Sequence, residues 1–213
     1  DGFLLQVNRS SADTLRVFAA DDLQTPTLEL AFPDGANVHD VQICGGRIFA
    51  ASYEQPVVWI YDPATGVLDG SVDLTPYDDG DGSPEADTMV ELGGVLYLSL
   101  NQLERDADWG STRGTVLEIN CSDGGVSNSW EVGPNPTLHP IPGDETHLLV
   151  RTGVWWEPDG ALARLDVAGG TMGDSIRSES TTGVDLTGLA AVDAQHALTI
   201  EYDYAGDQSH VVG

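Results

Sequence analysis

The chain has no lysine, and its only fixed positive charges are eight arginines. Against them stand 35 aspartates and glutamates, so the formal net charge is −27. A field of this sign repels nucleic acid phosphates and anionic membranes, so we expect neither as a partner, and it favours cationic partners or bound metal ions. The plainer explanation is solubility in a salty or extracellular setting.

Long apolar runs and cysteine motifs are also missing. No stretch of about 18 apolar residues occurs, so we expect no membrane insertion. Cys44 and Cys121 are the only cysteines, and they have no metal-ligand spacing around them. The chain begins without methionine, inside a strand pattern, and we expect a mature or trimmed piece of a longer protein.

What the sequence does contain is a series of short strands. Residues 36–74 hold four β-rich runs, VHDVQIC, RIFAASY, VVWIYD and VLDGSVDL, separated by Gly-Gly, Glu-Gln-Pro and Pro-Ala-Thr-Gly. No window of eleven or more residues keeps a helical period without Gly or Pro, so we expect no helix longer than about two turns.

The four-strand pattern recurs along the chain. Gly45-Gly46 and Gly93-Gly94 fall at the same place in two successive units, between the first and second strands. One such unit cannot bury both of its faces and must stack on neighbours, which predicts an all-β fold, a β-propeller of four-stranded antiparallel blades. We expect one array over 1–213, with blades at 36–75, 83–133 and 135–179, a partial blade at 1–34 that lacks its first strand, and another partial blade at 183–213.

The segment IYDPATGVLDGSVDL resembles the bacterial repeat propellers, in which the third strand ends in a DxxTG turn, here Asp62 to Gly66. The chain is thus similar to YncE-like and related surface-layer or quinoprotein-like propellers. It has no WD dipeptide at the ends of its third strands and no tryptophan docking motif of the quinone enzymes, so the resemblance implies a fold and no activity.

In such propellers ligands usually bind on the face that carries the longer loops. We expect residues 78–87, the insert 101–113 and the pair Trp155-Trp156 to share that face. An exposed tryptophan beside carboxylates suits a sugar, a quaternary amine or a cationic side chain. The simpler alternative is that one ring is wedged between blades and the other covers the edge of a blade. The candidate ligand-binding residues are Glu54, Trp109, Trp155, Trp156, Glu157 and Asp159.

The run DDGDGSPEAD places five carboxylates within residues 78–87. Hard cations such as Ca²⁺ take oxygens from flexible acidic loops of this composition, although the run is not an EF-hand. The candidate calcium ligands are Asp78, Asp79, Asp81, Glu85 and Asp87, and the alternative is a solvated acidic turn.

His39 and His139 occupy equivalent positions in two first strands, which face the central channel of a propeller. Two histidines converging there could hold a metal, although no carboxylate is placed in sequence to complete the set.

Three functions stay open. The favoured one is a secreted or cell-surface binding and scaffolding module without catalysis, engaging a protein or glycan, with an extracellular, periplasmic or cell-surface location. The alternatives are a metal-dependent propeller hydrolase, lactonase or lyase, and a structural repeat of a surface layer or filament.

The cysteines yield a further prediction. Cys44 ends a first strand and Cys121 follows the third strand of the next blade, so two strand spacings of about 5 Å each, plus the separation of the blades, would divide them. A disulfide needs Cα atoms within about 7 Å, so we expect the two not to be bonded, although secretion would favour a bond.

Overall fold

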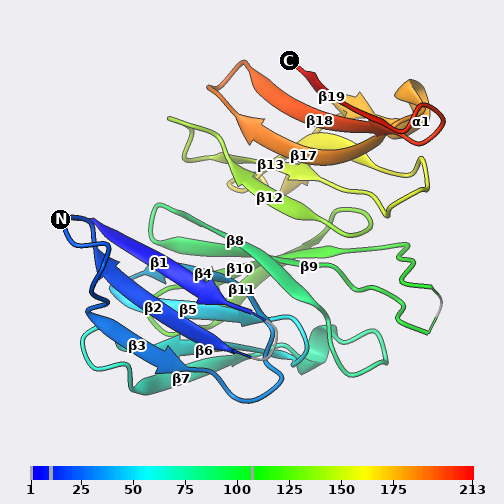
Figure 1. The fold of residues 1–213 in the computed structure, drawn as a ribbon. Coiled ribbons are helices and arrows are strands. Elements are labelled where there is room, and N and C mark those ends of the chain that lie inside the picture. Colours follow the sequence, from blue (N-terminus) through cyan, green and yellow to red (C-terminus); the bar gives the residue numbers. More distant parts are fainter. Residues whose placement is uncertain (1, 10–11, 107) are drawn as a thin grey trace.

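Five antiparallel sheets follow one another along the chain (Figure 1). The computed structural model describes residues 2–9, 12–106 and 108–213. The first sheet consists of β1 (Phe3–Asn8), β2 (Thr14–Ala19) and β3 (Leu28–Ala31). The second consists of β4 (Val38–Cys44), β5 (Arg47–Ser52), β6 (Val57–Tyr61) and β7 (Leu68–Asp73), and the third of β8 (Ala86–Leu92), β9 (Val95–Leu100), β10 (Thr115–Asn120) and β11 (Val126–Glu131). The fourth consists of β12 (Thr137–Pro140), β13 (His147–Arg151), β14 (Ala161–Asp166), β15 (Thr171–Met172) and β16 (Arg177–Ser178), and the fifth of β17 (Asp185–Ala191), β18 (Ala197–Asp203) and β19 (Gln208–Val212).

The all-β prediction is confirmed. Within the described residues the only α-helix is the four-residue α1 (Glu179–Thr182), and one 3₁₀ turn spans Thr75–Tyr77. None of these helices is long and apolar enough to cross a membrane.

The sheets stack face to face, and the core lies between them. Alternate residues of β5 point to opposite faces, so that Ile48 packs with Leu15 toward the first sheet while Phe49 packs with Leu98 toward the third. Further apolar clusters join the third sheet to the fourth and the fourth to the fifth. The inner sheets therefore bury both faces, as stacked repeats require.

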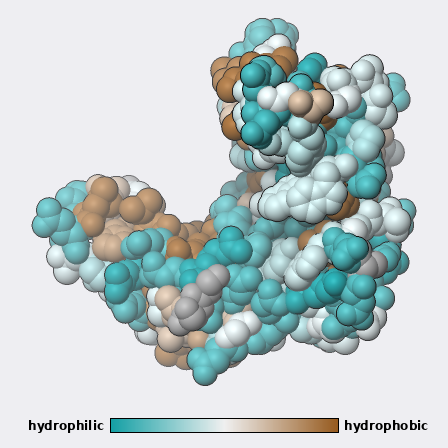
Figure 2. All heavy atoms as spheres, turned by 45° about the vertical axis from the view of Figure 1, so that its right-hand side comes forward, coloured by the Kyte–Doolittle hydropathy of each residue, from teal (hydrophilic) through white to brown (hydrophobic). Residues whose placement is uncertain are grey.

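Backbone pairing also shows how the sheets correspond. The N–H of Phe32 bonds the carbonyl of Asp13 beside β2, at the place where Leu74 bonds Pro56 beside β6. β2 therefore occupies in the first sheet the place that β6 occupies in the second. Within the described residues no sheet closes on itself, and Figure 2 shows an L-shaped outline with a hollow between its two arms.

Polar side chains tie neighbouring sheets at repeated positions. Asp40 of β4 accepts a hydrogen bond from the N–H of Met89 at 2.8 Å, and Thr88 of β8 accepts one from the N–H of Leu138 at 2.8 Å. Both acceptors lie at a register shift in the first strand of their sheet. Burial raises the pKa of Asp40 to about 6, against the backbone N–H groups that favour its charged form.

The prediction that the cysteines stay apart is wrong. Cys44 and Cys121 form a disulfide, with Cα atoms 5.5 Å apart. The prediction separated the two cysteines by the lateral distance between strands of one sheet as well as by the spacing between sheets. The turn after β10, however, bends over the second sheet. A Cβ placed on Gly124 of that turn would lie 2.9 Å from Cδ1 of Ile60, and one on Gly45 would lie 3.2 Å from Cβ of Cys121. The turn, and not the strand, bridges the gap.

Candidate functional site

A cavity of about 540 Å³ opens at the end of the fold where β4, β8 and β12 begin. Residues from four of the five sheets line it: Arg9, His39, Tyr53, Asp87, Asn101, Leu103, Asp108, Trp109, Asn135, Thr137, Arg151, Val154, Trp155 and Trp156. Most come from the loops that join second to third strands, at 9–13, 53–56, 101–114 and 152–160. His39, Asp87, Asn135 and Thr137 lie at or just before the starts of first strands, and Arg151 is the last residue of β13.

The prediction of a shared loop face is confirmed. Trp109 of the insert 101–113 lines the same cavity as Trp155 and Trp156. The insert also touches the acidic turn, since Nε of Arg105 lies 3.4 Å from Oδ2 of Asp81. Loop length in the sequence therefore predicted which face of the array carries the cavity, because the long connections gather on one side.

At the floor of the cavity His39 lies between two charged groups. Its Nδ1 is 2.7 Å from Oδ1 of Asp87, and its Nε2 receives a hydrogen bond from Nη2 of Arg9. A guanidinium can only donate, so Nε2 is the acceptor and Nδ1 carries the proton that Asp87 accepts. The His39 ring stacks on Tyr53 with centroids 3.8 Å apart and planes 11° apart.

Three tryptophans form the rim. Trp109, Trp155 and Trp156 are 50%, 59% and 64% exposed, which is far more than Trp59 in the core at 7%. Trp155 and Trp156 lie in the turn between β13 and β14. Their rings meet edge to face at 67°, with centroids 5.8 Å apart.

The backbone at this rim is held in an uncommon conformation. Trp109 has φ of 62° and Trp156 has φ of 60°, in the left-handed region that bulky residues rarely adopt. The N–H of Trp156 donates to Oδ2 of Asp185 at 2.7 Å, which fixes the turn. Such conformations persist where the surrounding structure holds them and gather at ligand-binding sites.

Arg105 supports the rim from behind. Its Cζ lies 5.4 Å from the centroid of Trp109 and 5.9 Å from that of Tyr53. Its Nε lies 2.6 Å from Oε1 of Glu85, which is fully buried, and its Nη1 bonds Glu54. Burial raises the pKa of Glu85 to about 7, against the opposing effect of Arg105 and the N–H of Leu103.

The other predicted ligand residues lie away from the cavity wall. Glu54 is bound by Arg105 and by Nδ2 of Asn37 at 3.3 Å. Asp159 accepts a hydrogen bond from the N–H of Val154 at 3.0 Å and so shapes the turn, and Glu157 is exposed. Of the six residues predicted to bind a ligand, the cavity brings together the three tryptophans.

The two predicted channel histidines do not share the cavity. His39 lines it, but His139 is absent from its lining. Burial, and secondarily the charge of Arg151, lowers the pKa of His139 to about 4, so the ring is neutral at physiological pH. His139 is a half-buried strand residue outside the cavity, so it does not pair with His39 as a metal ligand there.

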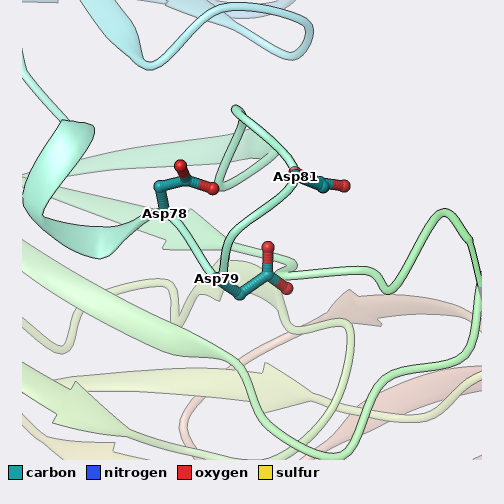
Figure 3. Close-up of side chains that lie close together, drawn as sticks. All are labelled: Asp78, Asp79 and Asp81. Carbon is teal, nitrogen blue, oxygen red and sulfur yellow. The ribbon is translucent and has the colours of Figure 1, made fainter.

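The acidic turn divides into two parts, the first of which is drawn in Figure 3. Asp78, Asp79 and Asp81 place carboxylate oxygens within 4.8 Å of one another, the only group of three or more metal-ligating side chains found among the described residues. Glu85 and Asp87 turn away, toward Arg105 and His39 respectively. The five predicted ligands therefore do not converge, because Glu85 lies just before β8 and Asp87 within it, and both face other partners.

Asp79 is the strained member of this group. Its Oδ1 is buried without a hydrogen-bond partner, and burial together with the charge of Asp81 raises its pKa. Asp78 is satisfied by the N–H groups of Gly80 and Gly82 at 2.9 and 3.0 Å. Three carboxylates suit the oxygen preference of Ca²⁺, although Arg105 already faces Asp81.

Sequence reasoning missed the cationic and amide residues of the cavity and its tyrosine, namely Arg9, Arg151, Asn101, Asn135 and Tyr53. Because the chain has only eight arginines, each of them was a candidate for the site. The sequence does not show which of them lie outside ion pairs. Their convergence depends on how the sheets stack, which no local pattern encodes.

Comparison with known proteins identifies the fold. No protein-family model and no curated protein matches the chain. Among solved structures, a chain of the mitotic checkpoint complex superposes with a TM-score of 0.64 at 12% identity, over 94% of this chain and 54% of that one. Hydrazine synthase of Kuenenia stuttgartiensis gives 0.64 at 16% identity, over 98% and 60%, and the Neurospora crassa Pan2 WD40 domain gives 0.61 at 11%, over 94% and 56%.

These similarities support a β-propeller fold. The chain spans between 54% and 60% of these three solved chains. At such low identity the likeness concerns architecture, and function has to be argued from the cavity.

Proposed function

We propose that the chain is a non-catalytic binding and scaffolding module that engages a protein or glycan partner at the cavity mouth. The observation that carries this is the rim of three tryptophans, each at least half exposed and supplied by two separate loops. Exposed aromatic residues around a concave site are the usual anchors of binding. Exposing the apolar surface of these three tryptophans to water is unfavourable in free energy, and a bound partner would remove that surface from water.

The test is to probe glycan and extracellular-protein arrays with the labelled chain and with Trp155→Ala. The matched control is Phe3→Ala, which removes an aromatic side chain that is 60% exposed and lies outside the cavity. We expect a set of binders that Trp155→Ala loses and Phe3→Ala keeps. Binders that both variants keep would place the binding surface elsewhere and refute the proposal.

We further propose an extracellular, periplasmic or cell-surface location. The Cys44–Cys121 disulfide supports it, because disulfides persist in oxidising compartments. Alkylation of free thiols during lysis of the source cells, followed by peptide mapping, tests this. Recovery of both cysteines as alkylated thiols would contradict it.

Calcium is an accessory proposal for the Asp78, Asp79 and Asp81 group. The three oxygens within 4.8 Å support it, and binding at the cavity does not depend on it.

A metal-dependent hydrolase, lactonase or lyase is less well supported. His39 is the only imidazole in the cavity lining, and both of its nitrogens are engaged, one by Asp87 and one by Arg9. A general base or metal ligand needs a free ring nitrogen. Binding therefore accounts for this arrangement better than catalysis does.

A structural repeat of a surface layer or filament is the second candidate. Apolar side chains are exposed on the first and fifth sheets, notably Phe3, Leu198 and Val211 at 60%, 44% and 70%. Figure 2 shows apolar residues gathered in several separate places on the surface. Sedimentation velocity across a concentration series tests this, since a repeat unit would assemble as concentration rises and a binding module would not.

A further inference from the structure

The arginines of this acidic chain differ in whether they form ion pairs. Arg16, Arg47, Arg105 and Arg177 each have a carboxylate oxygen within 4.0 Å. In the described part of the chain the remaining four, Arg9, Arg113, Arg151 and Arg164, have none. Two of those four, Arg9 and Arg151, line the tryptophan-rimmed cavity.

Both cavity arginines are held by neutral acceptors. Nε of Arg9 donates to Oδ1 of Asn37 at 3.3 Å, and its Nη2 donates to His39. Nη1 of Arg151 donates to the carbonyl of Leu186 at 2.7 Å, and its Nη2 donates to Oγ1 of Thr137 at 2.7 Å. A guanidinium carries five N–H groups, so these contacts orient each arginine and leave further donors for a ligand.

The charge of the cavity differs from that of the whole chain. Its lining holds two arginines and two aspartates, Asp87 and Asp108, whereas the chain carries −27. Asp87 is already engaged by His39, and the charges of Glu179 and Asp87 both act on Arg151. Charges beyond about 10 Å are largely screened at 0.1 M salt, so a bound group would respond to the guanidinium groups beside it and not to the distant carboxylates.

We propose that the cavity takes a ligand with a carboxylate beside a flat apolar surface. The carboxylate lies with Arg9 and Arg151, and the flat surface lies against Trp155 and Trp156. Guanidinium groups match a carboxylate in geometry and charge, and indole faces match the apolar face of a sugar ring or an aryl group. This inference rests on the proposed binding function and names its ligand class, and it reverses the cationic partner expected from net charge.

Two matched pairs of probes test the proposal. Methyl β-glucuronide is compared with methyl β-glucoside, and phenylacetate with phenylacetamide, so that each pair differs in the carboxylate. Three of the five tryptophans line the cavity, so intrinsic fluorescence of the full chain reports binding. In at least one pair we expect the carboxylate to bind about tenfold more tightly, as hydrogen bonds to a charged group allow. The responding pair distinguishes a uronic acid residue from an aryl acid.

Variants locate the effect. Arg9→Gln and Arg151→Gln should each reduce the preference for the carboxylate to about twofold, consistent with loss of one charge-assisted contact. Arg9 lies at the surface, so Arg9→Gln keeps the test valid if Arg151→Gln fails to fold. Arg16→Gln is the control, because Arg16 pairs with Glu29 outside the cavity, and it should keep the full preference.

Three outcomes would overturn the inference. Equal binding of the neutral and charged members, lost in Trp155→Ala, would refute the carboxylate and leave the binding function standing. Retention of the preference in both arginine variants would also refute it. No binding of any probe up to about 10 mM, a weak-affinity limit, would reject this ligand class, and the array experiment would then decide the binding function separately.

Discussion

Cys44, the last residue of β4, is joined to Cys121, the first residue after β10, so one covalent bond clamps the second sheet to the third. Both side chains are only 2% exposed and pack in the core cluster between those sheets. The backbone carbonyl of Cys121 also accepts a hydrogen bond from Arg47. The cavity residues His39 and Asp87 are the second residues of β4 and β8, so the disulfide joins the same two sheets that supply them.

The disulfide should contribute strongly to stability. It closes a loop with a sequence separation of 77 residues. In the chain-entropy model such a loop is worth about 4 kcal/mol, so Cys44→Ala/Cys121→Ala should lower the free energy of unfolding by that order. Urea unfolding with and without reductant measures it. The double variant serves as the control, since reductant should not change its midpoint, and an unchanged midpoint for fully reduced wild type would contradict the prediction.

Glu85 makes stability depend on pH. Burial raises its folded pKa from 4.5 to about 7, so between these values the folded chain binds more protons than the unfolded one. Stability from this group is therefore complete below about pH 4.5 and declines as the pH rises toward 7. Repulsion among the many carboxylates also lowers the stability of the folded chain as the pH rises. The effect of Glu85 is therefore isolated by comparing the wild type with Glu85→Gln. The variant should show a shallower loss of unfolding free energy from pH 5 to 8, and parallel curves would refute the assignment.

Arg105→Gln should be damaging in a pH-dependent way. Arg105 is the cationic partner of the fully buried Glu85 and also contacts Glu54 and Asp81. Removing one member of a buried pair costs about 3 kcal/mol or more. The loss should be larger at pH 8 than at pH 5, where Glu85 can take a proton instead. Thermal unfolding at both pH values measures it, and Arg16→Gln, an exposed pair, should cost under about 1 kcal/mol at either.

A variant of Asp79 distinguishes a calcium site from a solvated acidic turn. Its unpartnered Oδ1 and the charge of Asp81 make the turn unfavourable without a cation. In chelator, Asp79→Asn should therefore raise the melting temperature. In millimolar Ca²⁺ the wild type should gain stability and the variant should not. Glu157→Gln, an exposed carboxylate outside the group, is the control, and an equal calcium response in both variants would assign the effect to general screening.

Much of the fold could be predicted because its signals are local. The runs VHDVQIC and RIFAAS became β4 and β5, and the Gly-Gly pair between them has positive φ at both positions, 57° and 74°. Alternating apolar residues and turn chemistry act over a few residues, so they can be read directly from the sequence.

The site was predicted only in part because it depends on stacking. The exposed tryptophans were visible as unusual residues in long loops. Asp87 looked like the end of an acidic run, yet it begins β8 and faces His39, 48 residues earlier. Arg9 and Arg151 reach the cavity from the first and fourth sheets, and the disulfide depends on a turn that bends across a sheet interface. These relations follow from the packing of sheets, which sequence periodicity does not specify.

Hydrogen–deuterium exchange with the tightest binder from the arrays tests the central claim, that the tryptophan-rimmed cavity is the binding surface. The account predicts protection on binding in peptides covering 37–41, 101–110 and 152–157, all of which carry or adjoin cavity residues. Peptides covering 66–73 and 206–213, which supply no cavity residue, should exchange at unchanged rates. Protection confined to those outer strands, with the tryptophan loops unchanged, would contradict it.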